Sequence, residues 1–356
     1  AMRVVVAMSG GVDSSVTAGL LAEAGHEVVG ITLQLYDHGA ATGRKGACCA
    51  GQDIHDARRI ADRLGIAHYV IDAEARFAAA VVEDFAAAYA AGRTPVPCVR
   101  CNQSVKFTDL TALARDLGAA ALATGHYVRR VEGAAGPELH RARDAARDQS
   151  WFLFATTAEQ LAFARFPLGE MPDKQAVRAE AARLGLPVAA KPDSQDLCFV
   201  PAGGYDEVLA RLRPEALVPG EIVDAAGTVL GRHAGIGRYT VGQARRLDLP
   251  ATAGARPVVT AIDPARRHLV VGERSAGTRQ VHLAEVNWLV SPPAEGIDCL
   301  VKLRSRDVLR PARVRPMAAG AVVELAEPAL PAPGQACVFY AGTRVLGGGF
   351  IRAAGD

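Results

Sequence analysis

The sequence predicts an α/β doubly wound parallel sheet, then a small β-rich central domain, then a C-terminal β-barrel. Three observations support this. Early in the chain, short apolar runs alternate with helix-like segments that end at glycine, which is typical of a parallel sheet covered by helices. Beyond two prolines the helical periodicity gives way to short strands separated by turn residues. Six strand-like runs follow in the last part of the chain, which indicates a small barrel. The expected domains are 1–200, 201–275 and 276–356.

The elements of the first domain follow from apolar runs and helix-closing glycines. Gly25, Gly65, Gly92 and Gly118 each follow an expected helix, since glycine takes the left-handed conformation that ends helices. Strands are expected over 3–8, 28–35, 69–71 and 121–124, and helices over 14–24, 53–64, 75–91 and 105–117.

The rest of the chain is expected to be mainly strand, apart from a helix over 205–212. The central strands are expected over 221–231, 238–242, 256–262 and 267–272. The barrel strands are expected over 281–290, 299–304, 312–317, 321–326, 336–342 and 344–351.

Composition narrows the class of protein. Half of the residues are hydrophobic, which excludes a disordered chain, and no apolar run approaches the roughly 18 residues that span a bilayer. The N-terminus does not resemble a signal peptide, so we expect a cytoplasmic protein. With 40 basic and 38 acidic residues, any nucleic-acid site must be a local patch. Only five of the basic residues are lysine, namely Lys45, Lys106, Lys174, Lys191 and Lys302.

A glycine loop, SGGVDSS over residues 9–15, lies between the first strand and the first helix. Its glycines allow successive N–H groups to point at an anion, and Asp13 is a candidate magnesium ligand on phosphates. The loop lacks the lysine of the Walker motif and resembles the signature of the PP-loop ATP pyrophosphatases, which cleave ATP between the α and β phosphates. The alternative is a tight turn in which Ser or Asp caps the helix.

Seven cysteines in a chain without a secretory signal favour thiol chemistry or metal binding over a disulfide framework. Cys101 lies near an expected helix N-terminus, beside Arg100 and one turn before Lys106, and both features favour thiolate. Cys98 and Cys101 also have the spacing of a zinc half-site, which Cys48 and Cys49 would complete. Spacing alone does not distinguish a reactive thiolate at Cys101 from a zinc ligand. Cysteines between apolar neighbours are more often core thiols, which applies to Cys198, Cys299 and Cys337.

Seven segments, in order and in register, resemble the bacterial tRNA-specific 2-thiouridylases of the MnmA type, within the PP-loop superfamily. They are SGGVDSS, AGRTPVPCVRCNQSVKF, ATGHY, RDQSWFLF, PDSQDLCFV, GRHAGIGRYTVGQ and PGQACVFY. The family sulfurates C2 of the wobble uridine in tRNAs for Lys, Glu and Gln. The resemblance therefore implies a PP-loop, Rossmann-like catalytic domain and a monomeric tRNA-uridine 2-sulfurtransferase that converts ATP to AMP and pyrophosphate.

The resemblance also implies roles for individual residues. Adenylation of the C2 oxygen would precede sulfur transfer, with Cys198 carrying a persulfide received from a sulfur-relay donor protein. Cys101 would be the nucleophile, and a Cys101–Cys198 disulfide would close as sulfur is released. ATP would contact Ala7, Met8, Ser9, Gly10, Gly11, Val12, Asp13 and Ser14, with Leu33 at the adenine and Gly125 nearby.

The tRNA contacts implied by the resemblance are spread along the chain. The target base would meet Val96, Pro97 and Cys98. Other tRNA contacts would be His126, Arg147, Asp148, Gln149, Arg304, Ser305 and Gln335. A wobble uridine lies in a single-stranded loop and can be splayed into a pocket, where His126 and Tyr127 would stack on it or hydrogen-bond to it.

Three residues depart from the family pattern. Val96 stands where the family commonly has asparagine, and Arg147 where it has lysine. Cys98 stands where aspartate is frequent, so Cys98, Cys101 and Cys198 are candidate ligands of a [4Fe–4S] cluster with one open iron.

The stretch 302–315 holds six basic residues and one acidic residue, Asp307. If these residues alternate along strands, the basic side chains share one face and can follow a phosphate backbone. The alternative is an ordinary solvated face of a sheet.

Two competing functions remain at this stage. A PP-loop ligase or amidase acting on a small molecule would explain the glycine loop but would leave Cys101, Cys198 and the basic stretch without a role. A zinc- or cluster-stabilised RNA-binding protein would hold nucleotide without turnover.

Overall fold

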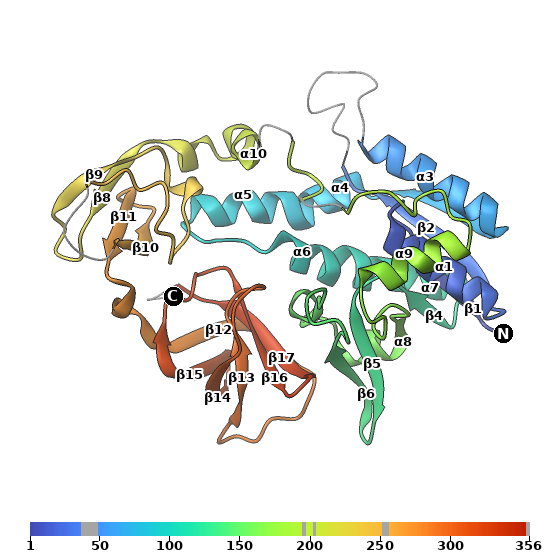
Figure 1. Ribbon diagram of the computed structural model, residues 1–356. Coiled ribbons are helices and arrows are strands. Elements are labelled where there is room, and N and C mark those ends of the chain that lie inside the picture. Colours follow the sequence, from blue (N-terminus) through green and yellow to red (C-terminus); the bar gives the residue numbers. More distant parts are fainter. Residues whose placement is uncertain (37–48, 194–196, 202–203, 251–255, 354–356) are drawn as a thin grey trace. The chain divides into compact units, whose positions relative to one another are not determined.

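The computed structural model describes residues 1–36, 49–193, 197–201, 204–250 and 256–353 (Figure 1). The chain forms two compact units. The first contains Ala1–Val81, Cys98–Phe199 and Thr343–Val345; the second contains Val82–Pro97, Val200–Gly342 and Leu346–Asp356. Since residues 82–97 cluster with the second unit, this division differs from the expected domains, and the three-domain division stays a prediction. No helix in the described part of the chain is long and apolar enough to cross a membrane.

The first unit is built on a five-stranded parallel sheet with the strand order β3-β2-β1-β4-β7. Its strands are β1 (Arg3–Ala7), β2 (Glu27–Gln34), β3 (Ala67–Asp72), β4 (Ala121–Ala123) and β7 (Ala164–Arg165). Successive residues of β1 are buried, as expected for a strand covered on both faces. The doubly wound parallel sheet is therefore confirmed.

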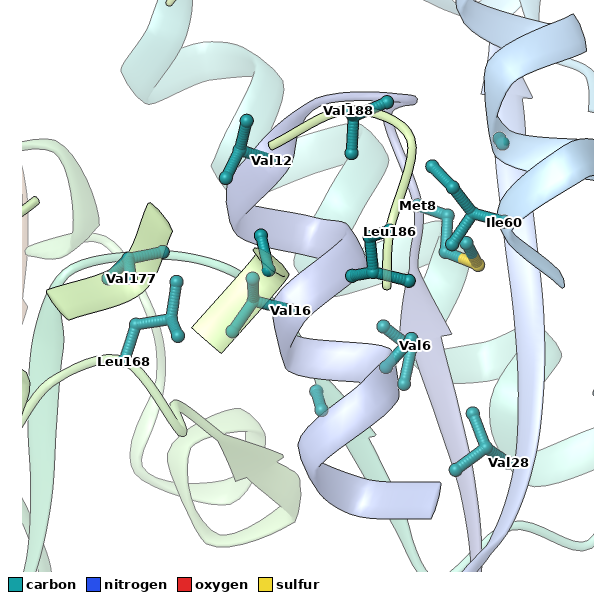
Figure 2. Close-up of a cluster of buried hydrophobic side chains, with 14 of the residues drawn as sticks. Val6, Met8, Val12, Val16, Val28, Ile60, Leu168, Val177, Leu186 and Val188 are labelled. Atoms are coloured by element: carbon teal, nitrogen blue, oxygen red, sulfur yellow. The ribbon is translucent and has the colours of Figure 1, made fainter. Parts of the chain in front are cut away.

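Helices alternate with these strands along the chain, and several of them contact the sheet. They are α1 (Val12–Glu23), α3 (Cys49–Leu64), α4 (Glu74–Phe77), α6 (Pro97–Arg100), α7 (Leu110–Asp116), α8 (Ala158–Phe163) and α9 (Lys174–Arg183). Figure 2 shows one cluster of this core, in which Val12 and Val16 of α1 lie among side chains of β1, β2 and α9. The cluster holds the start of α1 at the carboxyl end of β1.

Several helix boundaries differ from the expectation. The helix expected over 105–117 begins earlier, because α6 and the π-helical segment η2 (Cys101–Asp109) lead directly into α7. The helix expected over 75–91 is divided into α4, a π-helical segment η1 (Ala78–Val82) and α5 (Glu83–Ala90).

A hairpin of β5 (Val128–Gly133) and β6 (Gly136–Arg141) was not expected at all. Its strands read VRRVEG and GPELHR, so they lack the apolar alternation that reveals a half-buried strand.

The second unit contains two β structures and two helices, α5 and α10 (Tyr205–Leu212). The smaller sheet has the order β10-β11-β8-β9. These strands are β8 (Gly220–Val223), β9 (Val229–His233), β10 (Val258–Asp263) and β11 (His268–Gly272). The strand expected over 238–242 is wrong. Tyr239 and Val241 are buried in this core, but they follow a short 3-10 helix, and Gly242 has a φ of 90° that ends any strand.

The C-terminal strands close into a six-stranded barrel, as expected. They are β12 (Thr278–Trp288), β13 (Ile297–Lys302), β14 (Arg310–Met317), β15 (Gly320–Ala329), β16 (Ala336–Ala341) and β17 (Arg344–Ile351). The order is β12-β15-β14-β13-β16-β17, and an additional β12–β17 pairing closes the ring. Cys337 is fully buried in the barrel core and Cys299 packs against it, which confirms core packing for both thiols.

Candidate active site

The glycine loop lies at the point where the strand order of the parallel sheet reverses. Chain connections run from β1 toward β2 and β3 on one side, whereas β4 and β7 lie on the other. In such sheets the crevice outside the carboxyl ends of the two central strands is the usual ligand site. The loops that border it here are 8–11 after β1 and 124–126 after β4.

Two glycines are required by the backbone at this edge of the sheet. Gly10 has a φ of +77°, and a Cβ atom there would lie 2.2 Å from the carbonyl oxygen of Asp53. At Gly125, a Cβ atom would lie 2.9 Å from the backbone nitrogen of Ser14. Both predicted positions therefore border the start of α1, whereas Leu33, the residue expected at the adenine, is partly exposed near the end of β2.

The first turn of α1 has no side-chain cap. Gly11 occupies the cap position with extended backbone and makes no capping hydrogen bond. The Oγ atom of Ser14 instead accepts from the backbone nitrogen of Ser9 at 3.0 Å, and the Oγ atom of Ser15 donates to the Gly11 carbonyl at 2.6 Å. The interpretation of the loop as a Ser- or Asp-capped turn is therefore wrong. The helix presents its positive end and first-turn N–H groups without a side-chain acceptor.

Two lysines flank the loop, and sequence reasoning did not assign either of them to the site. The Nζ atom of Lys191 donates to the Gly10 carbonyl at 3.0 Å, to Asp53 at 2.7 Å and to Asp56 at 2.7 Å. The Nζ atom of Lys174 donates to the two carboxylate oxygens of Asp13 at 2.7 and 2.9 Å. The sequence offered one signal that could have singled them out: only five of the 40 basic residues are lysine.

Lys174 also connects the loop to a second carboxylate. Its Nζ atom lies 2.9 Å from Asp193, which also pairs with Arg147 at 2.9 Å and with Arg178 at 3.2 Å. Burial acts against ionisation of Asp193, but the hydrogen bonds and charges of Lys174 and Arg147 outweigh it and hold the pKa of this carboxyl below its ordinary value.

The three candidate thiols interact electrostatically within the first unit. Cys98 and Cys198 are exposed, whereas Cys101, the first residue of η2, is buried. The charge of Lys106 acts on all three thiols. Pro97 begins α6, where proline is favoured because its missing N–H has no helical partner, and Val96 before it is buried.

The expected thiolate character is wrong for this conformation. Cys98 and Cys198 are exposed as whole residues, but the protein atoms around their thiols displace hydrating water, as burial does for Cys101. This loss of hydration raises the pKa of Cys98 and of Cys101, and it raises the pKa of Cys198 to about 12. Lys106 lowers each value, as expected, but the loss of hydration around the thiols is the larger effect. All three thiols are therefore protonated near neutral pH.

His126 lies among aromatic rings at the end of β4. Its ring centroid is 6.0 Å from Phe107 and 6.5 Å from Phe166, and its Nδ1 atom is 2.7 Å from the Thr124 hydroxyl. Burial, together with the charge of Lys106, lowers the pKa of His126 to about 3, so its imidazole is neutral. Tyr127 is buried and its hydroxyl donates to Asp13, which places it with the glycine loop and not on an exposed platform for a base.

The turn that holds Arg147, Asp148 and Gln149 is organised by its own side chains. Asp148 is 4% exposed and accepts hydrogen bonds from Arg141 and from the backbone and hydroxyl of Ser150. The Gln149 side chain accepts from the Tyr127 backbone nitrogen at 2.9 Å. Arg147 is 42% exposed and is the member of this turn best placed to meet a ligand. A contact of the turn with tRNA stays a prediction.

In the second unit, one cavity of about 430 Å³ brings together Arg304, Ser305 and Gln335, three positions predicted to contact tRNA. Thr94, Thr240, Arg306 and Asp307 complete its lining. Arg304 donates to the carbonyl oxygens of Val241 and Leu330, and burial lowers its pKa.

The basic stretch 302–315 is not one alternating face, and that part of the prediction is wrong. Only Lys302 and residues from Arg310 onward belong to strands, because a loop joins β13 to β14. Most of the basic groups also have partners within the protein: Arg310 pairs with Asp307, Arg313 with Asp298 and Arg315 with Glu324. Arg306 is exposed, and among the described residues no ion pair involves it.

The described residues contain no group of three or more His, Cys, Asp or Glu side chains that could hold a metal ion. Cys98, Cys101 and Cys198 are all among them, and the [4Fe–4S] alternative for these three thiols stays a prediction. Cys48 and the side chain of Cys49, which the zinc alternative requires, lie outside the described residues.

Models of protein families match most of the chain. They are a tRNA methyl transferase HUP domain over residues 2–202, a tRNA methyl transferase PRC-barrel domain over 206–273 and an aminomethyltransferase beta-barrel domain over 278–351. Among solved structures, a 4-thiouridine synthetase bound to RNA and ATP has a TM-score of 0.35 and 15% identity, over 60% of this chain and 51% of that one. That likeness is too weak to bear on function.

Curated relatives are far more similar. The chain is 70% identical to the tRNA-specific 2-thiouridylase MnmA of Acidiphilium cryptum (strain JF-5), over 98% of this chain and 100% of that protein. It is 63% identical to the MnmA protein of Gluconobacter oxydans (strain 621H), over 99% of both. At such identity over such coverage, the chain belongs to the tRNA-specific 2-thiouridylase MnmA family.

Proposed function

We propose that this protein is a tRNA-uridine 2-sulfurtransferase that uses ATP to replace the C2 oxygen of the wobble uridine with sulfur. The observation that carries the proposal is the uncapped glycine loop at the reversal point of the sheet, in the same compact unit as Cys101 and Cys198. The glycine loop would bind the phosphates of ATP while the uridine oxygen is adenylated, and the thiols of Cys101 and Cys198 would deliver the sulfur.

ATP would lie over residues 7–14, with its phosphates at the start of α1, Leu33 at the adenine and Gly125 nearby. Asp13 is a poor magnesium ligand, because its oxygens already accept from Lys174 and Tyr127. A magnesium ion would therefore be held mainly by the nucleotide phosphates and water, as is common for this ion.

Sulfur transfer follows adenylation in the proposal. The C2 oxygen attacks the α-phosphate and pyrophosphate leaves. The terminal sulfur of a persulfide on the exposed Cys198 then attacks C2, and AMP leaves with the C–O electron pair. The Cys101 thiol then gives its proton to water and attacks the inner sulfur, which releases the thiouridine and leaves a Cys101–Cys198 disulfide. An external thiol must reduce this disulfide before the next turnover.

The partners in the proposal are tRNA and a sulfur-relay protein that loads Cys198. The base would meet Val96, Pro97 and Cys98, and the RNA would extend to His126, to the turn at Arg147 and to the cavity at Arg304, Ser305 and Gln335. A ligase acting on a small molecule is not favoured, because it gives no role to the thiols or to this cavity.

A gel assay tests the proposal. Unmodified transcripts of the Lys, Glu or Gln tRNAs are incubated with ATP, magnesium and a low-molecular-weight persulfide, whose outer sulfur can load Cys198. They are then run through a mercury-containing gel, which retards thiolated RNA. The retarded band should require ATP and disappear in Cys101→Ser, while Cys299→Ser, which alters a thiol at the barrel core, should keep it. AMP formation without a band would leave adenylation standing and remove the assigned sulfur chemistry. Neither AMP nor a band would reject the proposal.

A further inference from the structure

We propose that Cys98 is a resolving thiol, which reopens the Cys101–Cys198 disulfide by taking the place of Cys198 as the partner of Cys101. The proposal rests on the proposed function and goes beyond it. That function uses Cys101 and Cys198, leaves their disulfide to an external thiol and places Cys98 only beside the base.

Cys98 and Cys101 lie one helical turn apart. Cys98 is in α6, and Cys101 begins η2, which continues the same helix. Residues three apart in a helix are separated by about 4.5 Å along its axis and share a face, so their Cα atoms lie about 5 Å apart. Disulfides join Cα atoms that are about 4.4–6.8 Å apart. The backbone between the two residues is therefore already suited to a Cys98–Cys101 disulfide.

The Cys198 thiol lies close enough to interact electrostatically with both. Loss of hydration is the main cause of the raised pKa values, but the charge of Cys101 also raises the pKa of Cys98 and of Cys198, and the charge of Cys98 raises that of Cys198. Such effects require short separations, because charge interactions weaken with distance. All three thiols belong to the first unit. A disulfide can therefore pass from one pair of them to another.

The exposure of the three residues explains why a third thiol is useful. Cys101 is 7% exposed, whereas Cys98 and Cys198 are exposed residues. An external thiol would meet the disulfide at Cys198, and attack there leaves that thiol bonded to the residue that must next receive a persulfide. Cys98 instead attacks Cys101 from within the chain, at the high effective concentration of an intramolecular reaction, and Cys198 is left ready for reloading.

The exchange conserves atoms and electrons, because one disulfide replaces another. The Cys98 sulfur bonds to the Cys101 sulfur, and the Cys101–Cys198 bond breaks with its electron pair going to the Cys198 sulfur. The proton that Cys98 gives up passes through water to Cys198. Lys106 assists, because its charge lowers the pKa of Cys98 against the larger effect of lost hydration. An external dithiol then reduces the Cys98–Cys101 disulfide and is itself oxidised to a disulfide.

Tryptic peptides distinguish the two disulfides. Trypsin cleaves after Arg93, Arg100 and Lys106, so Cys98 falls in TPVPCVR and Cys101 in CNQSVK. The wild-type protein is loaded with a low-molecular-weight persulfide, freed of its excess, and given ATP, magnesium and an equimolar amount of unmodified tRNA. It is then denatured in acid, alkylated with N-ethylmaleimide, digested and analysed by mass spectrometry. We expect TPVPCVR linked to CNQSVK, with Cys198 alkylated. A linkage of CNQSVK to the peptide of Cys198 overturns the proposal.

Oxidation without RNA tests the same exchange independently of substrate binding. Wild-type protein, Cys98→Ser and Cys299→Ser are treated with equimolar diamide, which converts a pair of thiols into a disulfide. Wild type and Cys299→Ser, which alters a thiol at the barrel core, should form the Cys98–Cys101 disulfide. Cys98→Ser should shift the linkage of CNQSVK to the Cys198 peptide. A Cys101–Cys198 disulfide that persists in the wild type would contradict the resolving role. If Cys98→Ser does not fold, as judged by circular dichroism, Cys98→Ala replaces it.

Metal content and the RNA product separate this proposal from its alternatives. Iron bound by the three thiols in anaerobically purified protein would overturn it, because thiolates that ligate a cluster do not exchange disulfides. The proposed function fails separately, when the persulfide-loaded wild-type protein yields no RNA retarded in the mercury gel. The diamide map then still shows which thiol pairs with Cys101.

Discussion

The hydroxyl of Tyr127 donates a 2.6 Å hydrogen bond to Oδ1 of Asp13, and this bond joins the segment after β4 to the first turn of α1. The two strands that precede these residues are neighbours in the sheet, and the strand order reverses between them. Burial and the Asp13 carboxylate together raise the pKa of Tyr127, so its hydroxyl remains a donor throughout the physiological range.

Removing the Tyr127 hydroxyl tests how much its hydrogen bond to Asp13 stabilises the fold. Tyr127→Phe keeps the ring and removes a donor to a carboxylate, which should lower the free energy of unfolding by about 1.5–3 kcal/mol. Urea unfolding measures the change. Tyr69→Phe is the control, because Tyr69 is 54% exposed and its loss of a hydroxyl should be nearly neutral. Equal stability of Tyr127→Phe and wild type would contradict the role of this bond.

The glycine loop should not tolerate a Cβ atom at Gly10. Gly10→Ala adds both left-handed strain and a contact with the Asp53 carbonyl, so it should cost well above the roughly 1 kcal/mol typical of strain alone and abolish ATP binding. Gly25→Ala separates the two effects, because Gly25 has a φ of +81° but open space around it. The urea unfolding midpoint and the ATP affinity are measured for both variants. Similar losses of stability and of ATP affinity in the two variants would mean that the contact with the Asp53 carbonyl oxygen is unimportant.

The thiols should become reactive only as the pH rises. Because the pKa of Cys198 is raised to about 12, its thiolate fraction, and hence its rate of alkylation by iodoacetamide, should grow about tenfold per pH unit between pH 7 and 10. Lys106→Met should slow labelling further, since Lys106 lowers the pKa of each of the three thiols. Mass spectrometry locates the label. A plateau below pH 8 would show that the thiolate forms more easily than this structure implies.

His126 should make the protein less stable in acid. Its folded pKa, about 3, lies below the ordinary value of 6.5, so the unfolded chain binds the proton more readily. This contribution to stability is complete above pH 6.5 and is lost progressively as the pH falls toward 3. The slope of unfolding free energy against pH, measured between pH 4.5 and 7, should be smaller in His126→Gln. An unchanged slope would assign the acid sensitivity to other groups.

Arg304 and Arg306 should affect RNA binding differently. Arg306→Ala should reduce the salt slope of tRNA affinity by about one and leave stability unchanged, because this exposed side chain is free to contact a phosphate. Arg304→Ala should also lower stability, since it removes the donor to the Val241 and Leu330 carbonyls. Filter binding at several salt concentrations, beside urea unfolding, separates the two. Arg266→Ala, which alters an exposed arginine paired with Asp263, is the control and should change neither.

The sequence by itself determined the order of the elements and the chemistry of the motifs. Apolar runs closed by glycine revealed the parallel sheet, because a strand buried on both faces must be apolar throughout. SGGVDSS predicted a nucleotide loop, and the resemblance of seven segments to the 2-thiouridylases implied sulfur chemistry at Cys101 and Cys198. The hairpin of β5 and β6 escaped prediction because its strands are polar, and the strand over 238–242 was wrong because a positive φ at Gly242 overrides local apolar content.

Only the tertiary structure decided which charged side chains pair with one another. Lys174 and Lys191 lie more than 150 residues beyond the loop they flank, and no local pattern connects them to Asp13 or to Gly10. The protonation of Cys101 and Cys198 was likewise beyond sequence reasoning, which identified the nearby Lys106 but not the burial that outweighs it. Hydration is lost through packing against residues from many parts of the chain, so the balance between charge and burial exists only once the chain has folded.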